Sequence, residues 1–318
     1  MMATSNEKAV VLGATGPTGI HLCRALLEEG WQVTAVSRSV ANLERCFGNI
    51  AVQRVAADLR TLDDARRVIE GHDVAFDCIG LPGSMMSLHP VTARHIADAV
   101  GQGGVRCVQV SSFWSYLPLQ RLPLDENHPR EGGVDWVRFR REAEDILQEA
   151  GGAILHLPDF FGPYVHTSTL QQPLANAARG SAMNWIGAKN VARDYVYVPD
   201  AMQVAARIAR ESAAFGERWI LPGCGTITAM EIAEIAGRHL GRRIKVRAAG
   251  LRRLKLFSLF SSQLHQFMPM APYYVEAISY NSSKLESLIG PVQTTSYEQA
   301  IGETLNWINR QSGLVGTN

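Results

Sequence analysis

The chain has 318 residues, of which 46% are hydrophobic and 19% are charged, and its formal net charge is +1. This length fits one large domain, or one domain with a smaller appendage, and the composition is typical of a folded protein with a large core. A net charge near zero produces no long-range field that would attract nucleic acid, so we expect no nucleic-acid partner.

The five cysteines are odd in number, and none are spaced as Cys-x-x-Cys. This pattern argues against a disulfide framework and a zinc site, and it favours a reducing compartment and a protein without a bound metal. Residues 1–8 are polar, and no apolar run reaches the ~18–20 residues that a membrane span needs. The sequence therefore predicts a cytoplasmic protein without a transmembrane segment.

Strands and helices alternate through the first half of the chain. Apolar and β-branched runs predict strands, and apolar residues three or four positions apart predict helices. In chain order these are strand 8–12, helix 16–30, strand 32–36, strand 52–56, helix 63–69, strand 74–79, helix 91–100, strand 105–111, helix 137–150 and strand 153–157. Strands that are apolar on both faces and alternate with helices indicate an α/β fold with a doubly wound parallel sheet.

The alternation becomes irregular after Leu157, where Pro, Gly, Asn and aromatic residues are frequent. Further helices are predicted at 201–212, 230–240 and 298–310, and short strands at 195–198, 218–221 and 245–247. We expect residues 1–157 to form the dinucleotide-binding region and residues 158–318 to form mainly a smaller substrate-binding lobe. Elements of the second part should return to the core, so that the two parts make one integrated unit.

A glycine-rich turn lies between the first strand and the first helix, with glycines at positions 13, 16 and 19. Such glycines allow a tight turn, a close approach of the backbone to a pyrophosphate, and close packing of helix on strand. The helix N-terminus adds unpaired N–H groups and a partial positive charge for the phosphates. The turn predicts a dinucleotide site that includes Gly13, Thr15, Gly16, Pro17, Thr18 and Gly19.

The end of the second strand predicts which dinucleotide is bound. An NAD site usually has Asp or Glu there, to accept a hydrogen bond from the ribose 2′-hydroxyl. This chain has Ser37, Arg38 and Ser39 instead. Because Arg38 can pair with a 2′-phosphate and a neighbouring serine can donate to it, we expect NADP(H) in preference to NAD(H).

Two further strand ends are expected along the cofactor path. Asp58 and Leu59 follow the third strand, where a side chain can meet the adenine ring. Cys78, Ile79 and Gly80 end the fourth strand. Both segments are also compatible with simple turns at the ends of strands.

Taken together, these motifs resemble the short-chain dehydrogenase/reductase superfamily, in its extended and atypical branch of epimerase- and dehydratase-like proteins. The resemblance covers nearly the whole chain. It depends on the ordered set Gly13-x-x-Gly16-x-x-Gly19, Asp58-Leu59, Ser111-Ser112, Leu157 to Pro163, and Tyr195 to Asp200. It implies a Rossmann-type fold, a place for Pro158, Phe160 and Phe161 near the nicotinamide, and a place for Ser111 beside the reacting carbonyl or alcohol.

The chain departs from the family at the catalytic pair Tyr-x-x-x-Lys. The best alignment puts Trp136 and Arg140 at these positions. The indole of Trp136 cannot act as an acid or base, whereas Arg140 can still bind ribose or phosphate. Tyr116 is the first candidate for the missing proton donor, and the weaker candidates, which are also compatible with a role as pocket-lining side chains, are Tyr164, His166 and His128.

Residues 251–274 combine a basic cluster with many apolar side chains. The segment is compatible with an amphipathic helix that covers the substrate pocket, with a face that contacts a membrane surface, or with an apolar face packed on the main domain. An apolar cover would suit a bulky hydrophobic substrate. Six aromatic residues are candidates for the pocket walls, namely Phe113, Trp114, Trp136, Phe160, Phe161 and Trp185.

Three functions remain compatible with these patterns. The first is an NADP(H)-dependent oxidoreductase that acts on a carbonyl, alkene or hydroxyl of a small, hydrophobic molecule. The second is an epimerase or dehydratase that oxidises and re-reduces its substrate on a retained cofactor. The third is a dinucleotide-binding regulator or assembly protein without catalysis. A homodimer is compatible with the family resemblance.

Overall fold

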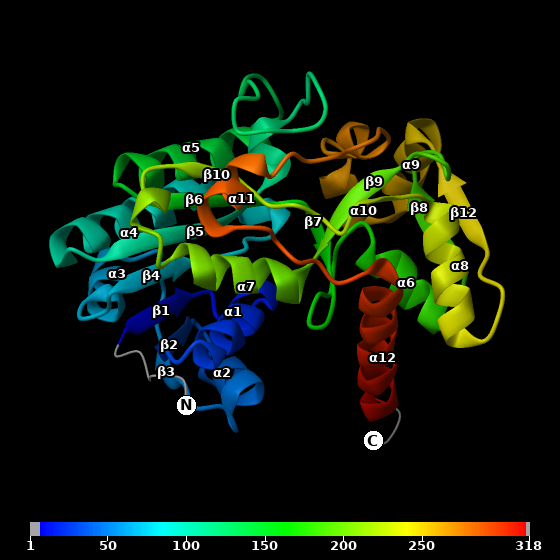
Figure 1. Cartoon of the computed structure of the whole chain (residues 1–318). Coiled ribbons are helices and arrows are strands. Elements are labelled where there is room, and N and C mark those ends of the chain that lie inside the picture. Colours follow the sequence, from blue (N-terminus) through cyan, green and yellow to red (C-terminus); the bar gives the residue numbers. More distant parts are fainter. Residues whose placement is uncertain (1–6, 316–318) are drawn as a thin grey trace.

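The computed structural model describes residues 7–315 and is built around a seven-stranded sheet (Figure 1). The strand order is β10-β6-β5-β4-β1-β2-β3, and every pairing in this sheet is parallel. The strands are β1 (Lys8–Leu12), β2 (Gln32–Ser37), β3 (Gln53–Ala56), β4 (Val74–Asp77), β5 (Arg106–Ser112), β6 (Ala153–Leu157) and β10 (Arg218–Ile220). The predicted α/β fold with a doubly wound parallel sheet is therefore confirmed.

Helices cover both faces of this sheet (Figure 1). One face is covered by α1 (Pro17–Glu28), α2 (Val40–Phe47) and α7 (Val198–Ile208), which pack on it through side chains such as Leu26 of α1 and Leu43 of α2. The other face is covered by α3 (Leu62–Ile69), α4 (His89–Gly103) and α5 (Asp135–Glu149), which pack on it through side chains such as Ile96 of α4 and Leu147 of α5. Because the strands are covered twice, β1 is hydrophobic on both faces, and its residues 9–12 are fully buried.

The strand order places a binding crevice at the middle of the sheet. The chain leaves β1 toward β2 and β3 on one side, and then returns to β4, β5 and β6 on the other side of β1. At such a reversal, the loops beyond the carboxyl ends of β1 and β4 diverge and open a crevice. The glycine turn after β1 and the segment after β4 both lie at this place.

The second lobe has two small sheets and its own core. Its strands are β7 (Asp159–Phe161), β8 (Met183–Ile186), β9 (Arg193–Tyr197), β11 (Thr226–Ile227) and β12 (Val246–Ala249). They form a β11-β9-β7 sheet and a β12-β8 pair. Apolar side chains such as Leu174, Trp185 and Leu305 pack between these strands and α6 (Gln171–Ala178), α8 (Ala229–Leu240) and α12 (Tyr297–Val315).

Several segments from the second half return to the main sheet. Strand β10 pairs with β6, and helix α7 packs against α1. Helix α11 (Ser283–Ile289) lies beside β10 and buries Leu285 in the main core. The main core therefore contains residues from both halves of the chain.

Some elements differ from the sequence-based expectation. The expected helix set lacked α2, which buries only Leu43 and Phe47 of its eight residues, and so presents a weak apolar pattern. It also lacked α6 and the short strands β7 and β8. These segments are short, and tertiary packing decides their conformation more than local propensity does.

A single amphipathic helix over residues 251–274 is not what the structure contains. The segment divides into α9 (Leu251–Phe257), a 3₁₀ turn (Ser258–Phe260), α10 (Ser262–Phe267) and a second 3₁₀ turn (Ala271–Tyr274). The Ser261 hydroxyl accepts a hydrogen bond from the Leu264 N–H at 3.3 Å and starts a new helix there. Further 3₁₀ turns lie at Gly83–Leu88, Phe113–Tyr116 and Ser212–Ala214.

Among residues 7–315, no helix has the length and apolar character needed to cross a membrane.

Candidate functional site

The glycine turn places the end of β1 directly against the end of β4. Gly13 has a φ of +79°, and a Cβ atom there would lie 2.9 Å from the Cys78 carbonyl oxygen. The Gly13 and Ala14 N–H groups donate to the Val36 carbonyl at 3.0 and 2.9 Å. Only glycine fits this left-handed position and close approach, so the first glycine of the motif shapes the floor of the crevice.

Gly16 and Gly19 have different tasks. Gly16 lines the crevice and has an ordinary φ of −78°. A Cβ atom on Gly19 would lie 2.6 Å from both the Ala14 Cα and the Gly13 oxygen. Gly19 therefore lets α1 pack on the turn behind the crevice, and it does not line the pocket itself.

The N-terminus of α1 presents N–H groups to the crevice. No side chain caps this helix, and the Ile20 N–H is the first that reaches back to Gly16 oxygen, at 2.9 Å. Pro17 has no N–H, and the N–H groups of Thr18 and Gly19 have no carbonyl within the helix to bind. Such an end, with its partial positive charge, is suited to the pyrophosphate of a dinucleotide.

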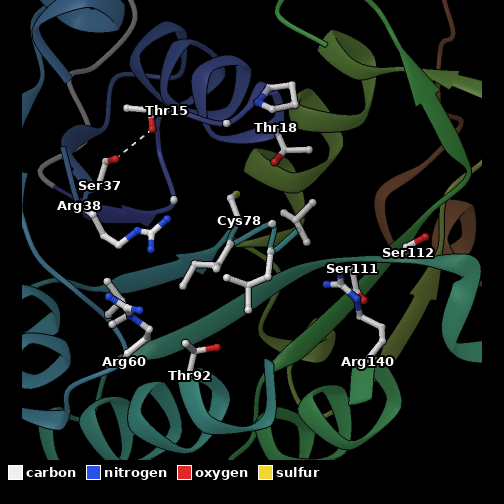
Figure 2. Close-up of a pocket in the computed structure, with 18 of the residues that line it drawn as sticks. Thr15, Thr18, Ser37, Arg38, Arg60, Cys78, Thr92, Ser111, Ser112 and Arg140 are labelled. Atoms are coloured by element: carbon white, nitrogen blue, oxygen red, sulfur yellow. Dashed lines mark hydrogen bonds between the residues drawn. The ribbon is translucent and has the colours of Figure 1, made fainter. Parts of the chain in front are cut away.

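The crevice continues as a pocket of about 410 Å³ along the carboxyl edge of the sheet (Figure 2). This volume lies within the usual range for cofactor and ligand pockets. Fifteen of the predicted site residues line it: Gly13, Thr15, Gly16, Pro17, Thr18, Ser37, Arg38, Asp58, Leu59, Cys78, Ile79, Gly80, Ser111, Arg140 and Phe160. Residues far apart in the sequence thus meet in one site.

Sequence reasoning missed several lining residues. Arg60 was missed although it lies two positions after Asp58, and Thr92 comes from α4, behind the strand ends. The others are Ala57, Leu81, Val110, Ser112 and Leu157. All but Thr92 lie in a strand or within four residues of its carboxyl end, which is the signal that would have identified them.

One branch of the pocket carries two arginines beside β2 and β3. The Ser37 and Thr15 hydroxyls are 3.0 Å apart, and Arg38 and Arg60 line the same branch (Figure 2). Arg60 forms an ion pair with Asp58, and this contact lowers the pKa of the Asp58 carboxyl. The branch therefore contains guanidinium and hydroxyl groups, and its two carboxylates are already paired, Asp58 with Arg60 and Asp64 with Arg67.

At the other end of the pocket, Arg140 lies beside Ser111 (Figure 2). The Nε of Arg140 is buried and has no hydrogen-bond partner among the described residues. Burial lowers the pKa of the Arg140 guanidinium, and the negative charges of Glu144 and Asp77 partly oppose this effect. Arg140 thus supplies a positive charge to the inner end of the pocket.

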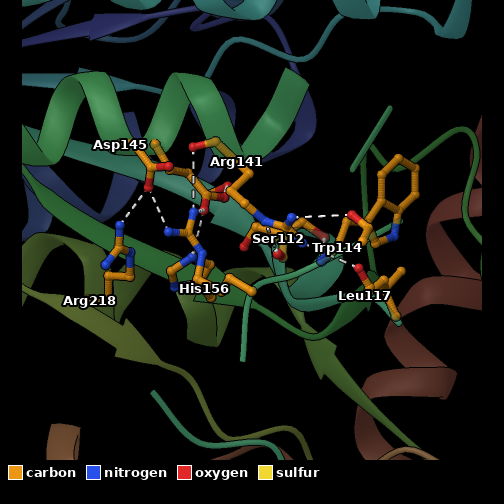
Figure 3. A network of polar contacts seen from close by, with 12 residues as sticks. Ser112, Trp114, Leu117, Arg141, Asp145, His156 and Arg218 are labelled. Atoms are coloured by element: carbon orange, nitrogen blue, oxygen red, sulfur yellow. Dashed lines mark hydrogen bonds and ion pairs between the residues drawn. The ribbon is translucent and has the colours of Figure 1, made fainter. Parts of the chain in front are cut away.

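Ser111 is held by a buried polar network. Its hydroxyl donates to Glu144, whose other carboxylate oxygen lies 2.8 Å from Arg130 and 3.1 Å from His156. Arg130 and Arg218 both bind Asp145 at 2.6 Å, which continues the network toward β10 (Figure 3). Burial opposes ionisation of Glu144, but His156, Arg130 and Ser111 together hold its pKa at about 2. Glu144 is therefore a permanent anion beneath Ser111.

The structure does not bring Tyr116 to this pocket. Its ring is fully buried, it meets the rings of His156 and His128 edge-on, and its hydroxyl has no partner among the described residues. Burial also raises the pKa of its hydroxyl. This geometry disfavours the predicted role as proton donor, because an acid must reach the substrate oxygen.

The segment after β6 places one of its three predicted residues in the pocket. Phe160 lines the pocket, whereas Phe161 is fully buried in the core of the second lobe. Successive side chains of strand β7 point to opposite faces, which explains the division. Pro158 is buried and is not among the lining residues.

The other candidate donors and aromatic walls also lie outside this pocket. Tyr164 accepts a hydrogen bond from Arg24, and the His166 ring lies against the ring of Trp307. His128 accepts a hydrogen bond from the Gln120 N–H at 2.8 Å. Trp136, at the position of the family tyrosine, stacks on Trp114 with ring centroids 6.2 Å apart. Phe113 and Trp185 are core residues, so Phe160 alone of the six expected aromatic residues lines the pocket.

Comparison with known proteins agrees with this geometry. Residues 13–152 match a family described as NAD(P)H-binding. Across 96% of the chain, the fold matches that of a UDP-glucuronic acid 4-epimerase from Bacillus cereus solved with NAD, with a TM-score of 0.79, 15% identity and coverage of 99% of that protein. The chain therefore has the fold of this epimerase, and its first half resembles NAD(P)H-binding proteins.

Two curated proteins that are similar to this chain are named for reactions on lipids. Sterol demethylase protein B of Methylococcus capsulatus is 27% identical over 231 residues, which cover 67% of this chain and 69% of that protein. Ceramide reductase of Caulobacter vibrioides is 28% identical over 170 residues, which cover 51% of this chain and 49% of that protein.

Proposed function

We propose that this protein is an NADP(H)-dependent oxidoreductase that acts on a carbonyl, alkene or hydroxyl group of a hydrophobic molecule. The observation that carries the proposal is the placement of Arg140 and Ser111 at the inner end of the dinucleotide pocket. Both would support a reacting oxygen there, although the chain lacks the tyrosine of the superfamily that it resembles.

The preference for NADP(H) is supported by the branch that contains Ser37, Arg38 and Arg60. A 2′-phosphate adds negative charge, which a guanidinium can bind through two parallel hydrogen bonds. No acid follows β2 that would accept from a free 2′-hydroxyl, and Asp58 is paired with Arg60. The residues present therefore fit NADP(H) better than NAD(H).

When bound, the cofactor would supply or accept the hydride. In reduction, the substrate oxygen gains negative charge, and Arg140 would stabilise this charge through its guanidinium. Arg140 is suited to this task because its nearby acids are already bound, Glu144 to Arg130 and Asp77 to Gln109 at 3.0 Å. Its charge therefore remains available to a ligand in a partly dry site, where it acts strongly.

Ser111 would hold the substrate oxygen next to Arg140. Because its proton points to Glu144, its lone pairs remain available to accept a hydrogen bond from a substrate hydroxyl. In oxidation, that contact would orient the hydroxyl, whose proton would pass to water as the hydride on the same carbon passes to the cofactor. Glu144 does not line the pocket, so it is a positioning residue that acts through Ser111.

A hydrophobic substrate is supported by the apolar side chains at this end of the pocket, Leu81, Leu157 and Phe160. The two curated relatives are named for a sterol and for a ceramide, both of which are hydrophobic. We therefore propose a lipid-like ketone, enone or alcohol as the substrate class. Loss of the family tyrosine, a base at the substrate hydroxyl, argues against the epimerase and dehydratase alternative.

The first test is calorimetric titration of the purified protein with NADPH and with NADH. We expect tighter binding of NADPH, and we expect Arg38→Ala to weaken NADPH binding at least about tenfold while changing NADH binding little. Arg94→Ala is the matched control, because Arg94 is exposed and pairs with Glu142 outside the pocket. Equal weakening of both nucleotides would refute the 2′-phosphate contact, and binding of neither, in protein free of bound nucleotide, would refute the proposed cofactor.

A further inference from the structure

An exposed apolar surface lies on the second lobe, at α9 and the turn that follows it. Leu256 and Phe257 are 57% and 52% exposed, and Leu259 and Phe260 are 72% and 85% exposed. Large side chains of this kind are rarely left together in water unless they meet a partner. Leu254 of the same helix is buried, so α9 is attached to the lobe by one side only.

Basic side chains surround these apolar residues. Arg252, Arg253 and Lys255 are exposed, and none of the ion pairs or hydrogen bonds found among the described residues involves their charged groups. We call Arg252, Arg253, Lys255, Leu256, Phe257, Leu259 and Phe260 together the 252–260 surface. Its composition, cationic groups beside protruding leucines and phenylalanines, is typical of helices that lie in a membrane interface.

The charge around the 252–260 surface is strongly one-sided. Residues 235–275 contain eight Lys and Arg and no Asp or Glu, which leaves 23 Lys and Arg against 30 Asp and Glu in the rest of the chain. The net charge of +1 is therefore the sum of +8 on residues 235–275 and −7 on the rest of the chain. Arg243, Lys245 and Arg247, on the approach to and in β12, are exposed and extend the positive region (Figure 1).

We propose that the 252–260 surface binds the face of an anionic lipid bilayer, with Phe257, Leu259 and Phe260 inserted among the headgroups and the basic residues on lipid phosphates. Lysine and arginine near an anionic membrane each add attraction, and the inserted side chains add burial. A second copy of the chain fits this surface poorly, because a face-to-face pair would bring two positive regions together.

The position of the surface gives this binding a use beyond the proposed reaction. Helix α10, which contacts α9, also contacts the 3₁₀ turn at Gly83–Leu88, and Leu81 just before that turn lines the pocket. The Trp114 indole donates to the Tyr274 hydroxyl at 2.6 Å and ties the end of the same segment to the turn after β5. A bilayer at the 252–260 surface would thus lie on the side of the pocket that contains Leu81, where a lipid-like substrate could enter from the membrane.

The test is co-sedimentation of the full chain with lipid vesicles, one set of phosphatidylcholine alone and one with about one-third phosphatidylglycerol. We expect binding to the anionic vesicles that weakens as salt is raised, and little binding to phosphatidylcholine. Binding to neither set, or equal binding to both, would overturn the proposal, because its basic residues would then contribute nothing.

Two double variants separate the apolar and basic contributions. Leu259→Ser with Phe260→Ser, and Arg252→Glu with Arg253→Glu, should each weaken binding to anionic vesicles at least about tenfold. The matched controls are Met230→Ser, an exposed apolar residue of α8, and Arg310→Glu, an exposed arginine of α12. Calorimetry with NADPH shows whether each variant is folded, and it tests the cofactor site separately from the membrane surface.

Sedimentation velocity without lipid completes the experiment. If the wild type is a dimer that these substitutions convert to a monomer, while vesicle binding is unchanged, the surface is an interface between copies and the proposal is wrong. If the variants lose vesicle binding and keep the oligomeric state and NADPH affinity of the wild type, the proposal stands.

Discussion

Arg38 and Arg140 lie at opposite ends of the pocket, and their surroundings differ. Arg38 is exposed at the mouth, whereas the Nε of Arg140 is buried and finds no hydrogen-bond partner within residues 7–315. An exposed arginine is readily satisfied by water, but a buried one needs a partner to offset its lost hydration. Arg140 is therefore the residue whose neighbours most clearly imply a polar ligand atom at the inner end.

Substitutions of Arg140 and Tyr116 should have opposite outcomes. Arg140→Gln is expected to lower turnover of a hydrophobic ketone by about 10²-fold, because it removes the charge that would stabilise the substrate oxygen. Tyr116→Phe should change turnover less than about threefold, since its hydroxyl is buried away from the pocket. Steady-state kinetics with NADPH, and Arg138→Gln on the exposed face of α5 as the control, would measure this.

A tenfold loss of turnover in Tyr116→Phe, with normal NADPH affinity, would restore Tyr116 as the proton donor. It would also mean that the loop after β5 rearranges when the substrate binds. An unchanged rate in Arg140→Gln would remove Arg140 from the mechanism.

Glu144 gives the protein a predictable response to acid. Its pKa is lowered from 4.5 to about 2 in the folded chain, because His156, Arg130 and Ser111 outweigh the effect of burial. A lowered folded-state pKa adds stability that is present above about pH 5 and is lost as the pH falls toward 2. Glu144→Gln should therefore reduce the free energy of unfolding at pH 7 by on the order of 3 kcal/mol and flatten its decline below pH 5.

Urea titrations of the wild type and Glu144→Gln at several pH values would measure this difference. Glu142→Gln is the control, because Glu142 is exposed and its pair with Arg94 is on the surface. Parallel pH curves for the wild type and Glu144→Gln would show that the Glu144 network is not the source of acid sensitivity.

At the scale of elements, local patterns predicted the strands and helices that build the crevice, and tertiary packing decided the rest. The runs that form β1, β4, β5 and β6 are mostly buried and contain several apolar residues each, so they could be predicted directly. The 251–274 segment could not, because its apolar residues are spread over two short helices and two 3₁₀ turns. Glu144 was likewise hidden, since nothing local predicts that an acid on α5 meets Ser111 from β5.

Substitutions in the glycine turn should affect stability at one position and cofactor binding at another. Gly19→Ala forces a Cβ within 2.6 Å of backbone atoms, so it should cost about 1–3 kcal/mol of stability. Gly16→Ala has an allowed φ of −78° and its nearest atom at 3.4 Å, so it should fold normally. Its methyl group would still occupy phosphate space in the pocket, and we expect NADPH binding at least about tenfold weaker.

Urea midpoints and NADPH calorimetry on both variants would distinguish these effects. A Gly16→Ala protein with unchanged stability and unchanged affinity would show that the phosphates do not lie against this turn. A Gly19→Ala protein as stable as the wild type would show that α1 can shift without cost.

The whole molecule combines two lobes through elements that cross between them. The main core includes Leu26 and Val108 from the first half, and Val204, Trp219 and Leu285 from the second. Because β10 extends the main sheet and α7 packs on α1, neither half can keep its core after the other unfolds. The sequence indicated this return only in outline, since short strands such as β10 have little local signal.

This shared core predicts how NADPH changes thermal unfolding. The pocket is formed by residues between Gly13 and Phe160, yet its supporting helices pack on elements from the second half. We expect a single transition in differential scanning calorimetry, and saturating NADPH should move it upward as a whole. At about 100 times its Kd, the nucleotide adds about 2.7 kcal/mol, which corresponds to a rise of about 4 °C in the transition temperature for a chain of this size. NADH at the same concentration should move the transition less, because it lacks the phosphate that Arg38 would bind. Two transitions, of which NADPH moves only one, would mean instead that the second lobe unfolds independently and that the crossing elements do not couple the halves.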